Sequence, residues 1–434
     1  MTQRPSTRDR LRSRLRNLGR AAAVIVTTGA MTLLVASPAA AVTVDRSSQY
    51  WLDSGYGIQQ AWKTTKGKGA VIAIMDTGIG KGPADFSGVT GGTDVSGVGS
   101  SDGRTPLGSE EEKNHGSWVA SLAAGRGDGS SDALLGVAPE AELLAISIGF
   151  PSSGATVPFV DQVAKGIHWA VDNGADVINM SFSTNTKDWD PSWDEAFKYA
   201  HDNGVVIVAA AGNRGSGTEM VGAPATIPGV LVVGGVDRSG EISVGASTEG
   251  ITIGVTAPSE DLTGVAADGQ RWQWAGTSGA SPIVAGMVAL LRSKYPDMDV
   301  NNIINRLIKT ANPSKNQGDD VPNADYGYGF ASIGAALNED IETVDANPMG
   351  SLEKWISVNR RAAAENVEPP KDTSKVKALS PIEKSSQSVN PLLPTPETLR
   401  YVSVPAALLL GAGTLIALGA IGATRHAKRV ARKK

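Results

Sequence analysis

The chain has 434 residues, of which 41% are hydrophobic and 5% aromatic, and it contains 51 glycines and no cysteine. This composition fits a large α/β domain with many tight turns, and the lack of cysteine excludes disulfides, thiolate nucleophiles and cysteine-ligated zinc. The formal net charge of the chain is −4, but the charge is unevenly distributed. The two ends, residues 1–41 and 425–434, carry +6 each, which leaves −16 on the body between them. Such an acidic body would repel the phosphates of a nucleic acid.

Residues 1–41 have the pattern of a signal peptide. Seven arginines between Arg4 and Arg20 precede an apolar stretch at 21–36, and small residues follow as far as Ala41. A basic segment, a short apolar segment and small residues in this order are typical of an export signal. We therefore predict cleavage after Ala41. The alternative is an uncleaved N-terminal anchor, although the apolar stretch is short for a bilayer.

Residues 45–340 alternate short apolar runs with helical stretches. The apolar runs lie at 69–76, 142–148, 175–182, 204–212 and 229–236. Runs without polar alternation indicate strands that are buried on both faces, as in a parallel sheet. Helical patterns at 159–174 and 191–204 separate some of them. We predict an α/β fold with a doubly wound, mostly parallel sheet flanked by helices.

Polar residues follow two of these predicted strands. Asp76 comes directly after "AVIAIM", and Asn213 comes after "VVIVAAAG". In a doubly wound sheet, functional groups gather beyond the carboxyl ends of the strands. A carboxylate at such a place needs a stabilising partner, and His115, at the start of a helical segment of small residues, is the candidate among the four histidines. The alternative for Asp76 is a turn residue.

The stretch "WAGTSGASPIVAGMVALL" at 274–291 predicts a buried helix whose first turn is crowded with small residues around Ser278. A serine hydroxyl becomes a nucleophile when a base lies within hydrogen-bond reach and an acid orients that base. We therefore predict that Ser278 is a nucleophile, that His115 is its base and that Asp76 orients His115.

The same helix start would help to stabilise an oxyanion. The side-chain amide of Asn213 and the backbone N–H of Ser278 are the predicted donors, and the helix N-terminus adds partial positive charge. Gly276 and Gly279 leave room for a substrate carbonyl. Pro282 is expected within the first turn, where N–H groups have no partner inside the helix.

Four sequence blocks resemble those of the subtilisin-like serine peptidases (subtilases). The blocks are "VIAIMDTGIG", "NHGSWVASLAAG", "VVIVAAAGN" and "GTSGASPIVAG". The Asp, His and Ser blocks stand in the family's order, and several such blocks on a compatible fold are a specific signal. The similarity covers about residues 50–337. It implies a subtilisin-like fold and a serine endopeptidase that hydrolyses peptide bonds in proteins and requires no cofactor.

The resemblance also implies further roles. It gives Asp76, His115 and Ser278 the roles of a catalytic triad and makes Asn213 the oxyanion donor. By the same similarity, Ser181, Phe182 and Ser183 would pair with the substrate backbone as an added strand, and Gly212 would lie against the side-chain pocket.

A structural calcium ion is a further implication of the resemblance. Asp85 lies at the spacing of a calcium ligand of the family, and Asp128 and Asp132 lie in the matching loop, where their oxygens would complete the site. The alternative is a polar surface turn without a metal.

The C-terminal part reads as a membrane tether. Residues 345–400 are rich in Pro, Ser, Lys and Glu and predict an extended stalk. Residues 402–424 are uncharged and long enough to span a bilayer, which favours a transmembrane helix over a buried core helix. The basic tail 425–434 should stay cytoplasmic, so the catalytic domain is expected outside the cell, bound to the cell membrane by a single span.

This layout is similar to that of the mycosins, subtilases associated with type VII secretion in actinobacteria. The expected partners are a protein or peptide substrate, the membrane through the C-terminal helix, and a secretion complex. The alternative from another functional class is a structural subunit of such a complex, in which proteolysis is incidental.

Overall fold

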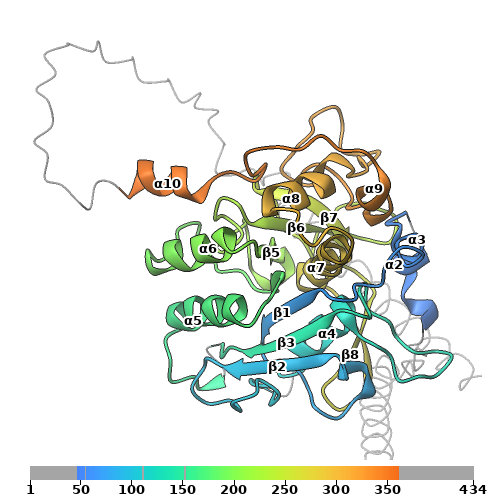
Figure 1. Ribbon diagram of the computed structural model, residues 1–434, viewed down its shortest axis with the longest axis vertical. Coiled ribbons are helices and arrows are strands. Elements are labelled where there is room, and N and C mark those ends of the chain that lie inside the picture. Colours follow the sequence, from blue (N-terminus) through green and yellow to red (C-terminus); the bar gives the residue numbers. More distant parts are fainter. Residues whose placement is uncertain (1–45, 54, 110–111, 151–152, 361–434) are drawn as a thin grey trace, which may run out of the picture. The chain divides into compact units, whose positions relative to one another are not determined.

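Figure 1 shows the computed structural model of the chain, which describes residues 46–53, 55–109, 112–150 and 153–360. The predicted signal peptide 1–41, membrane span 402–424 and basic tail 425–434 lie outside the described residues. Within the described part, no helix is both long enough and apolar enough to cross a bilayer.

The body is built on a sheet of seven strands in the order β2-β3-β1-β4-β5-β6-β7, and every neighbouring pair is parallel. The strands are β1 (Val71–Asp76), β2 (Val89–Asp94), β3 (Glu142–Ser147), β4 (Val177–Met180), β5 (Val206–Ala210), β6 (Leu231–Val236) and β7 (Ile253–Pro258). After β3 the chain crosses β1 to form β4 on its other side, which creates a topological switch point beside β1. The predicted parallel α/β fold is confirmed.

Alternate residues of β1 and of β3 to β7 enter two separate cores. Ile72 and Ile74 of β1 pack in a cluster with α4 (His115–Ala124) and α7 (Thr277–Lys294). Ala73 and Met75 face the opposite cluster, which contains residues of α5 (Phe159–Asp172) and α6 (Ser192–Asp202). Figure 1 shows α5 and α6 side by side along that face. Burial on both faces explains why the strands have no polar alternation.

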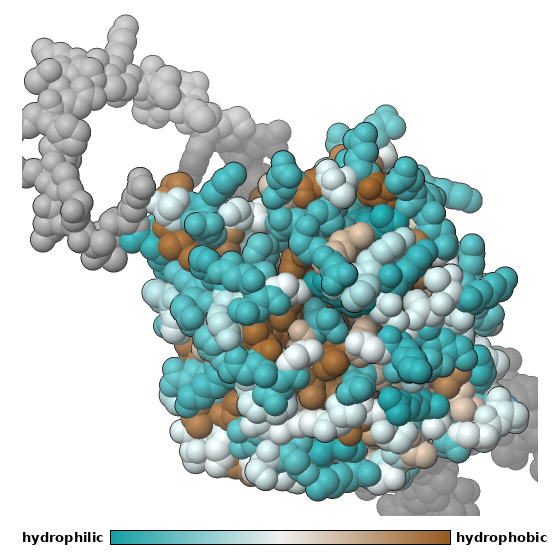
Figure 2. Space-filling view, in the orientation of Figure 1, coloured by the Kyte–Doolittle hydropathy of each residue, from teal (hydrophilic) through white to brown (hydrophobic). Residues whose placement is uncertain are grey.

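Shorter elements complete the body. They are η1 (Arg46–Ser48), α2 (Tyr50–Asp53), α3 (Ile58–Ala61), η2 (Ala84–Phe86), η4 (Arg214–Ser216), β8 (Leu262–Val265), β9 (Arg271–Trp274), α8 (Val300–Lys309), α9 (Ile333–Asn338) and α10 (Leu352–Asn359). β8 and β9 form an antiparallel hairpin. On the face shown in Figure 2, hydrophobic residues stand in small groups among hydrophilic ones, so most of the apolar side chains serve the two cores.

Two strands of the sheet, β2 and β7, were not among those predicted. β2 has the sequence "VTGGTD", which lacks an apolar run. Its glycines are required by a close approach of the chain, because a Cβ at Gly92 would lie 2.1 Å from the carbonyl oxygen of Asp102. The contact with residue 102 therefore requires glycine in this edge strand, and a search for apolar runs does not detect the strand.

The first part of the stalk predicted for residues 345–400 is folded, as far as residue 360, and the rest of it lies outside the described residues. Helix α10 lies against α6, and the ring of Trp355 stacks on that of Trp189 at 4.3 Å between centroids. At the end of α10, Nε of Arg360 donates to a carboxylate oxygen of Asp194 at 2.8 Å. The segment is mostly polar, so the few apolar residues at helical spacing that face the body did not predict a helix.

We expect Trp355→Ala to lower the free energy of unfolding by about 2 kcal/mol, because it removes a large aromatic contact. Val358→Ala is the matched control on the same helix, since Val358 is 74% exposed and its truncation should change stability by less than about 0.5 kcal/mol. Urea unfolding of both variants checks this, and equal effects would contradict the packing of α10 on the body.

Candidate active site

The centre of the candidate site is a hydrogen bond between a buried carboxylate at a strand end and an imidazole at a helix start. Asp76, the last residue of β1, is 0% exposed. Its Oδ1 lies 2.8 Å from Nδ1 of His115, the first residue of α4, and accepts the N–H of Thr77 at 2.7 Å. Its Oδ2 has no hydrogen-bond partner among the described residues. The charge of this carboxylate is therefore directed mainly at His115.

The contact with Asp76 determines the pKa of His115 and which ring nitrogen carries the proton. Burial of the ring opposes protonation, but the charge and the hydrogen bond of Asp76, together with the charge of Glu112, outweigh it, so the pKa of His115 lies above its ordinary value. An ionised carboxylate only accepts hydrogen bonds, so Nδ1 carries the proton and Nε2 of the neutral ring is left as a base. The side chain is 24% exposed, which leaves the ring open on one side.

The turn after β1 holds the start of α4 in place. The hydroxyl of Thr77 accepts the N–H of Gly116 at 2.9 Å and donates to the carbonyl of Lys113 at 3.1 Å. A Cβ at residue 116 would lie 2.5 Å from the carbonyl oxygen of Gly78. Only glycine next to His115 therefore lets the helix approach the strand closely enough for the ion pair to form.

Ser278 lies in the first turn of α7 and is partly exposed. Its Oγ donates to the backbone carbonyl of Ser181 at 2.9 Å. Among the described residues no hydrogen bond joins this hydroxyl to His115, and its one hydrogen bond is the one to Ser181. Catalytic hydrogen bonds are often absent or long without substrate, and rotation about χ1 would redirect the hydroxyl.

Trp274 links the surroundings of His115 and Ser278. Its ring meets that of His115 edge-on at 5.7 Å between centroids. A Cβ at Gly279, the residue after Ser278, would lie 3.1 Å from the outer edge of the same indole. His115 and the residue after Ser278 therefore border one aromatic side chain. The sequence does not by itself predict a role for Trp274, although Trp272 and Trp274 stand just before "GTS".

Asn213 follows β5 and lies at the N-terminus of α7. Its Oδ1 accepts both the N–H of Thr277 at 2.8 Å and the hydroxyl of Thr277 at 2.9 Å. The hydroxyl of Thr277 in turn accepts the N–H of Gly212 at 3.0 Å. Because the oxygen of the amide is used by donors, the Nδ2 donors remain for another acceptor. This is the orientation that an oxyanion donor beside Ser278 requires.

We expect Asn213→Ala to lower kcat by about 10²–10³-fold with little change in KM, the usual cost of removing one oxyanion donor. Asn213→Asp is the informative partner variant, because it keeps the oxygen that accepts from Thr277, loses the Nδ2 donor and adds a negative charge that repels an oxyanion. Steady-state hydrolysis of a peptide amide measures both. A kcat close to that of the wild type in Asn213→Asp would contradict the donor role.

The predicted substrate strand has its side chains divided between two environments. Phe182 is 7% exposed and its ring contacts those of Phe159 and Phe150, at 5.4 and 6.1 Å between centroids. Ser181 is buried beneath α7. The hydroxyl of Ser183 turns back onto its own loop, toward the carbonyl of Thr184 at 3.2 Å. Pairing of this segment with a substrate stays a prediction.

Gly212 adopts a backbone conformation that favours glycine, with φ at 107°. A Cβ there would lie 2.7 Å from a methyl carbon of Thr218. The residue lies directly before Asn213, and its predicted place beside a substrate side chain stays a prediction.

The three residues predicted to bind calcium lie in different environments, and Asp132 is exposed. Asp85 is 7% exposed, and burial raises the pKa of its carboxyl. Asp128 pairs with Arg271 at 3.0 Å and accepts from the hydroxyl of Ser130. No group of three or more His, Cys, Asp or Glu within the described ranges could hold a metal ion. This region fits a guanidinium as its cation better than the oxygen cage that calcium needs.

A structural calcium ion therefore stays a prediction, and it is tested by chelation. If calcium binds, EGTA should lower the melting temperature by several degrees, because a ligand that binds only the folded state stabilises it. An unchanged melting temperature would contradict calcium binding, and a calcium-saturated EGTA solution is the control.

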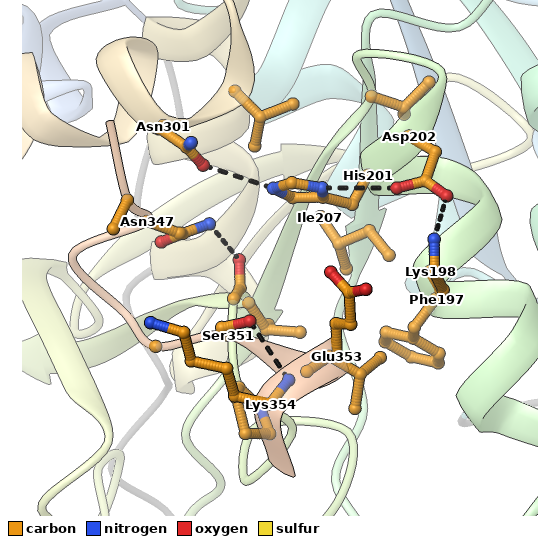
Figure 3. A pocket seen from close by; sticks show the side chains of 18 of the residues that line it. Phe197, Lys198, His201, Asp202, Ile207, Asn301, Asn347, Ser351, Glu353 and Lys354 are labelled. Atoms are coloured by element: carbon orange, nitrogen blue, oxygen red, sulfur yellow. Dashed lines mark hydrogen bonds and ion pairs between the residues drawn. The ribbon is translucent and has the colours of Figure 1, made fainter. Parts of the chain in front are cut away.

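A cavity of about 280 Å³ lies away from these residues (Figure 3). It is lined by Ile207, near the start of β5, by Val230, just before β6, and by residues of α6, α8 and α10. His201 lies between Asp202 and Asn301 on its wall, with Nε2 at 3.2 Å from Oδ1 of Asn301. It opens at the amino ends of the strands, whereas Asp76 and Asn213 follow the carboxyl ends, so it is separate from the candidate active site.

Comparisons with known proteins agree with this arrangement. A model of the subtilase family matches residues 67–329. The chain is 37% identical to Subtilisin DY of Bacillus licheniformis over 286 residues, which cover 62% of this chain and 92% of that relative. It is 31% identical to Mycosin-4 of Mycobacterium tuberculosis over 297 residues, 58% of this chain and 62% of that relative. The chain thus spans less than two thirds of the mycosin.

Solved structures of the same kind superpose on the body. The MycP3 protease from the type VII (ESX-3) secretion system matches with a TM-score of 0.58 and 28% identity, over 70% of this chain and 90% of that one. MycP1 from Mycobacterium smegmatis matches with a TM-score of 0.58 and 28% identity, over 69% of this chain and 86% of that one.

Proposed function

Because the chain belongs to the subtilase family and is a serine endopeptidase, we propose that it cleaves proteins by attack of Ser278 on a peptide carbonyl. His115 is the general base, Asp76 orients it, and the amide of Asn213 binds the oxyanion. The observation that carries this proposal is the buried hydrogen bond of 2.8 Å between Asp76 and Nδ1 of His115. It leaves Nε2 free to accept a proton beside the helix that bears Ser278.

The proposed reaction begins when the hydroxyl of Ser278 turns from the carbonyl of Ser181 toward Nε2 of His115. Oγ bonds to the substrate carbonyl carbon as its proton passes to Nε2, and the carbonyl electrons move to the oxygen. Nδ2 of Asn213 and the N–H of Ser278 stabilise this oxyanion. The imidazolium, held by Asp76, then protonates the leaving amine, and a water molecule hydrolyses the acyl-enzyme by the same path.

Substrate binding and location are parts of the same proposal. Ser181, Phe182 and Ser183 would pair with the substrate backbone, and Gly212 would border a side-chain pocket. The protein would act at the outer face of the cell membrane, with a cleaved signal peptide at 1–41 and a single span at 402–424. Fractionation of cells with protease protection of the body tests this location, and a body protected in intact cells would contradict it.

Labelling with a serine-reactive fluorophosphonate tests the nucleophile. The wild-type protein should be labelled, and Ser278→Ala should not. Ser293→Ala, near the other end of the same helix, is the matched control and should label normally. Labelling that survives in Ser278→Ala, or an unlabelled wild-type protein, would contradict the proposed function.

A structural subunit of a secretion complex is the second candidate. It is favoured by the likeness to the MycP3 protease, which is described as part of a type VII secretion system. Secretion by cells carrying Ser278→Ala separates the two roles. If export continues with this variant and stops on deletion of the chain, the scaffold role is the one that the cell needs.

A further inference from the structure

Helix α7 has a proline at a position where it removes a hydrogen bond from the nucleophile. In an α-helix each backbone N–H donates to the carbonyl four residues earlier. α7 begins at Thr277, so the residue that would donate to the carbonyl of Ser278 is Pro282, which has no N–H. The expectation that Pro282 falls in the first turn was therefore wrong, because the helix starts far enough before it for the lost bond to matter.

The carbonyl of Ser278 has another donor. Oγ of Ser181 lies 2.8 Å from it and donates its proton to it. Ser181 comes from the segment after β4, far from α7 in the sequence, and is 2% exposed. We propose that Ser181 is a positioning residue whose hydroxyl replaces the helical N–H that Pro282 lacks and so fixes the turn that carries the nucleophile.

The surrounding hydrogen bonds determine the direction of this contact. A serine hydroxyl has one proton to donate, and its oxygen accepts from other groups. Asn179 in β4 donates from Nδ2 to Oγ of Ser181 at 2.8 Å, and Oγ of Ser281 lies 3.1 Å away, where either hydroxyl can donate. The carbonyl of Ser278 can only accept. Asn179 and Ser281 are both 0% exposed. The proton of Ser181 is therefore directed at the carbonyl of Ser278, and the central sheet anchors it.

Ser181 contacts Ser278 in a second way. Its backbone carbonyl accepts the hydroxyl of Ser278 at 2.9 Å, while its side chain holds the carbonyl of Ser278. In the proposed reaction the first contact is released when Oγ turns toward His115, and the second one persists. The persistent contact keeps the backbone of the nucleophile in place while its side chain moves, and misplacement of a reacting group by about 1 Å can cost on the order of 10²-fold in rate.

A double-mutant cycle tests this role, which rests on the proposed function. Ser181→Ala should lower kcat about 10- to 100-fold with KM nearly unchanged, because the turn of Ser278 loses its anchor. Pro282→Ala introduces a backbone N–H that can donate to the carbonyl of Ser278. In the Pro282→Ala background, the loss of kcat caused by Ser181→Ala should therefore be at least several-fold smaller. Ser293→Ala is the control that should keep wild-type kcat.

The outcomes separate this inference from the proposed function. If fluorophosphonate labels the wild-type protein at Ser278 but Ser181→Ala keeps full kcat, or if the two substitutions multiply without coupling, the positioning role is wrong. If the wild-type protein is neither labelled nor active, the proposed function itself fails. Melting temperatures of the four proteins give an independent readout. Should Ser181→Ala fail to fold, folding of the double variant supports the role and failure of both overturns it.

Discussion

Ser278→Ala should lower kcat by about 10⁶-fold, the scale of the loss when a subtilisin nucleophile is removed. The variant lacks the hydroxyl oxygen that attacks the carbonyl carbon. His115 then has no hydroxyl proton to accept, and no acyl-enzyme can form. Asn213 and the start of α7 remain, and they should keep a residual rate enhancement of about 10³–10⁴ over water. Hydrolysis of a peptide amide, followed with enough enzyme to detect slow turnover, measures the loss.

Peptide binding should survive the same substitution. Ser278 is partly exposed, and its side chain makes one hydrogen bond, to the carbonyl of Ser181, among those described. Its truncation therefore leaves the fold and the cleft intact, and a peptide should bind Ser278→Ala with nearly the wild-type Kd. The control is Ser293→Ala at the far end of the helix. Residual activity within tenfold of the wild type would show that another residue performs the attack.

Asp76→Asn should lower kcat by about 10⁴-fold, because an amide can hold His115 in the tautomer that leaves Nε2 protonated. It should also shift the pH dependence. In the wild type the pKa of His115 lies above its ordinary value, since Asp76 outweighs the effect of burial. His115 is an active base only when neutral, so kcat/KM falls as the pH drops through this raised pKa.

Without the carboxylate, burial remains as the main influence and lowers the pKa of His115. The acid limb of the pH profile should therefore move to lower pH in Asp76→Asn, while the maximal rate is much smaller. Asn213→Ala serves as the comparison, because it changes the site without adding a charge and without altering the hydrogen bond between Asp76 and His115. A limb at the same pH in Asp76→Asn and the wild type would mean that Asp76 does not set the basicity of His115.

The fold was predictable where burial alone decides the residues. β1, β3, β4, β5 and β6 are read from continuous apolar runs, since both of their faces are covered by helices. β2 was hidden because a loop lies against its glycines, as the close approach of Asp102 to Gly92 shows. α10 was not predicted because its few apolar residues stand in a polar segment. Their role is clear only from the contact of α10 with α6.

The site was predictable in part for a related reason. Strand ends and helix starts are local features, so Asp76, His115 and Asn213 could be placed at one edge of the sheet, and the first two are found in hydrogen-bond contact. The contact of Ser181 with Ser278 joins residues 97 positions apart. Only the three-dimensional structure reveals that the hydroxyl of Ser181 takes the place of the backbone N–H that Pro282 lacks.

The packing of α10 offers a practical route to orient the enzyme on a support. The chain contains no cysteine, so Val358→Cys would create a unique thiol at a position that is 74% exposed in the native protein. This position lies on the helix that borders the cavity at the amino ends of the strands. Coupling through it would leave the carboxyl edge of the sheet, where Asp76 and Asn213 lie, open to dissolved peptides.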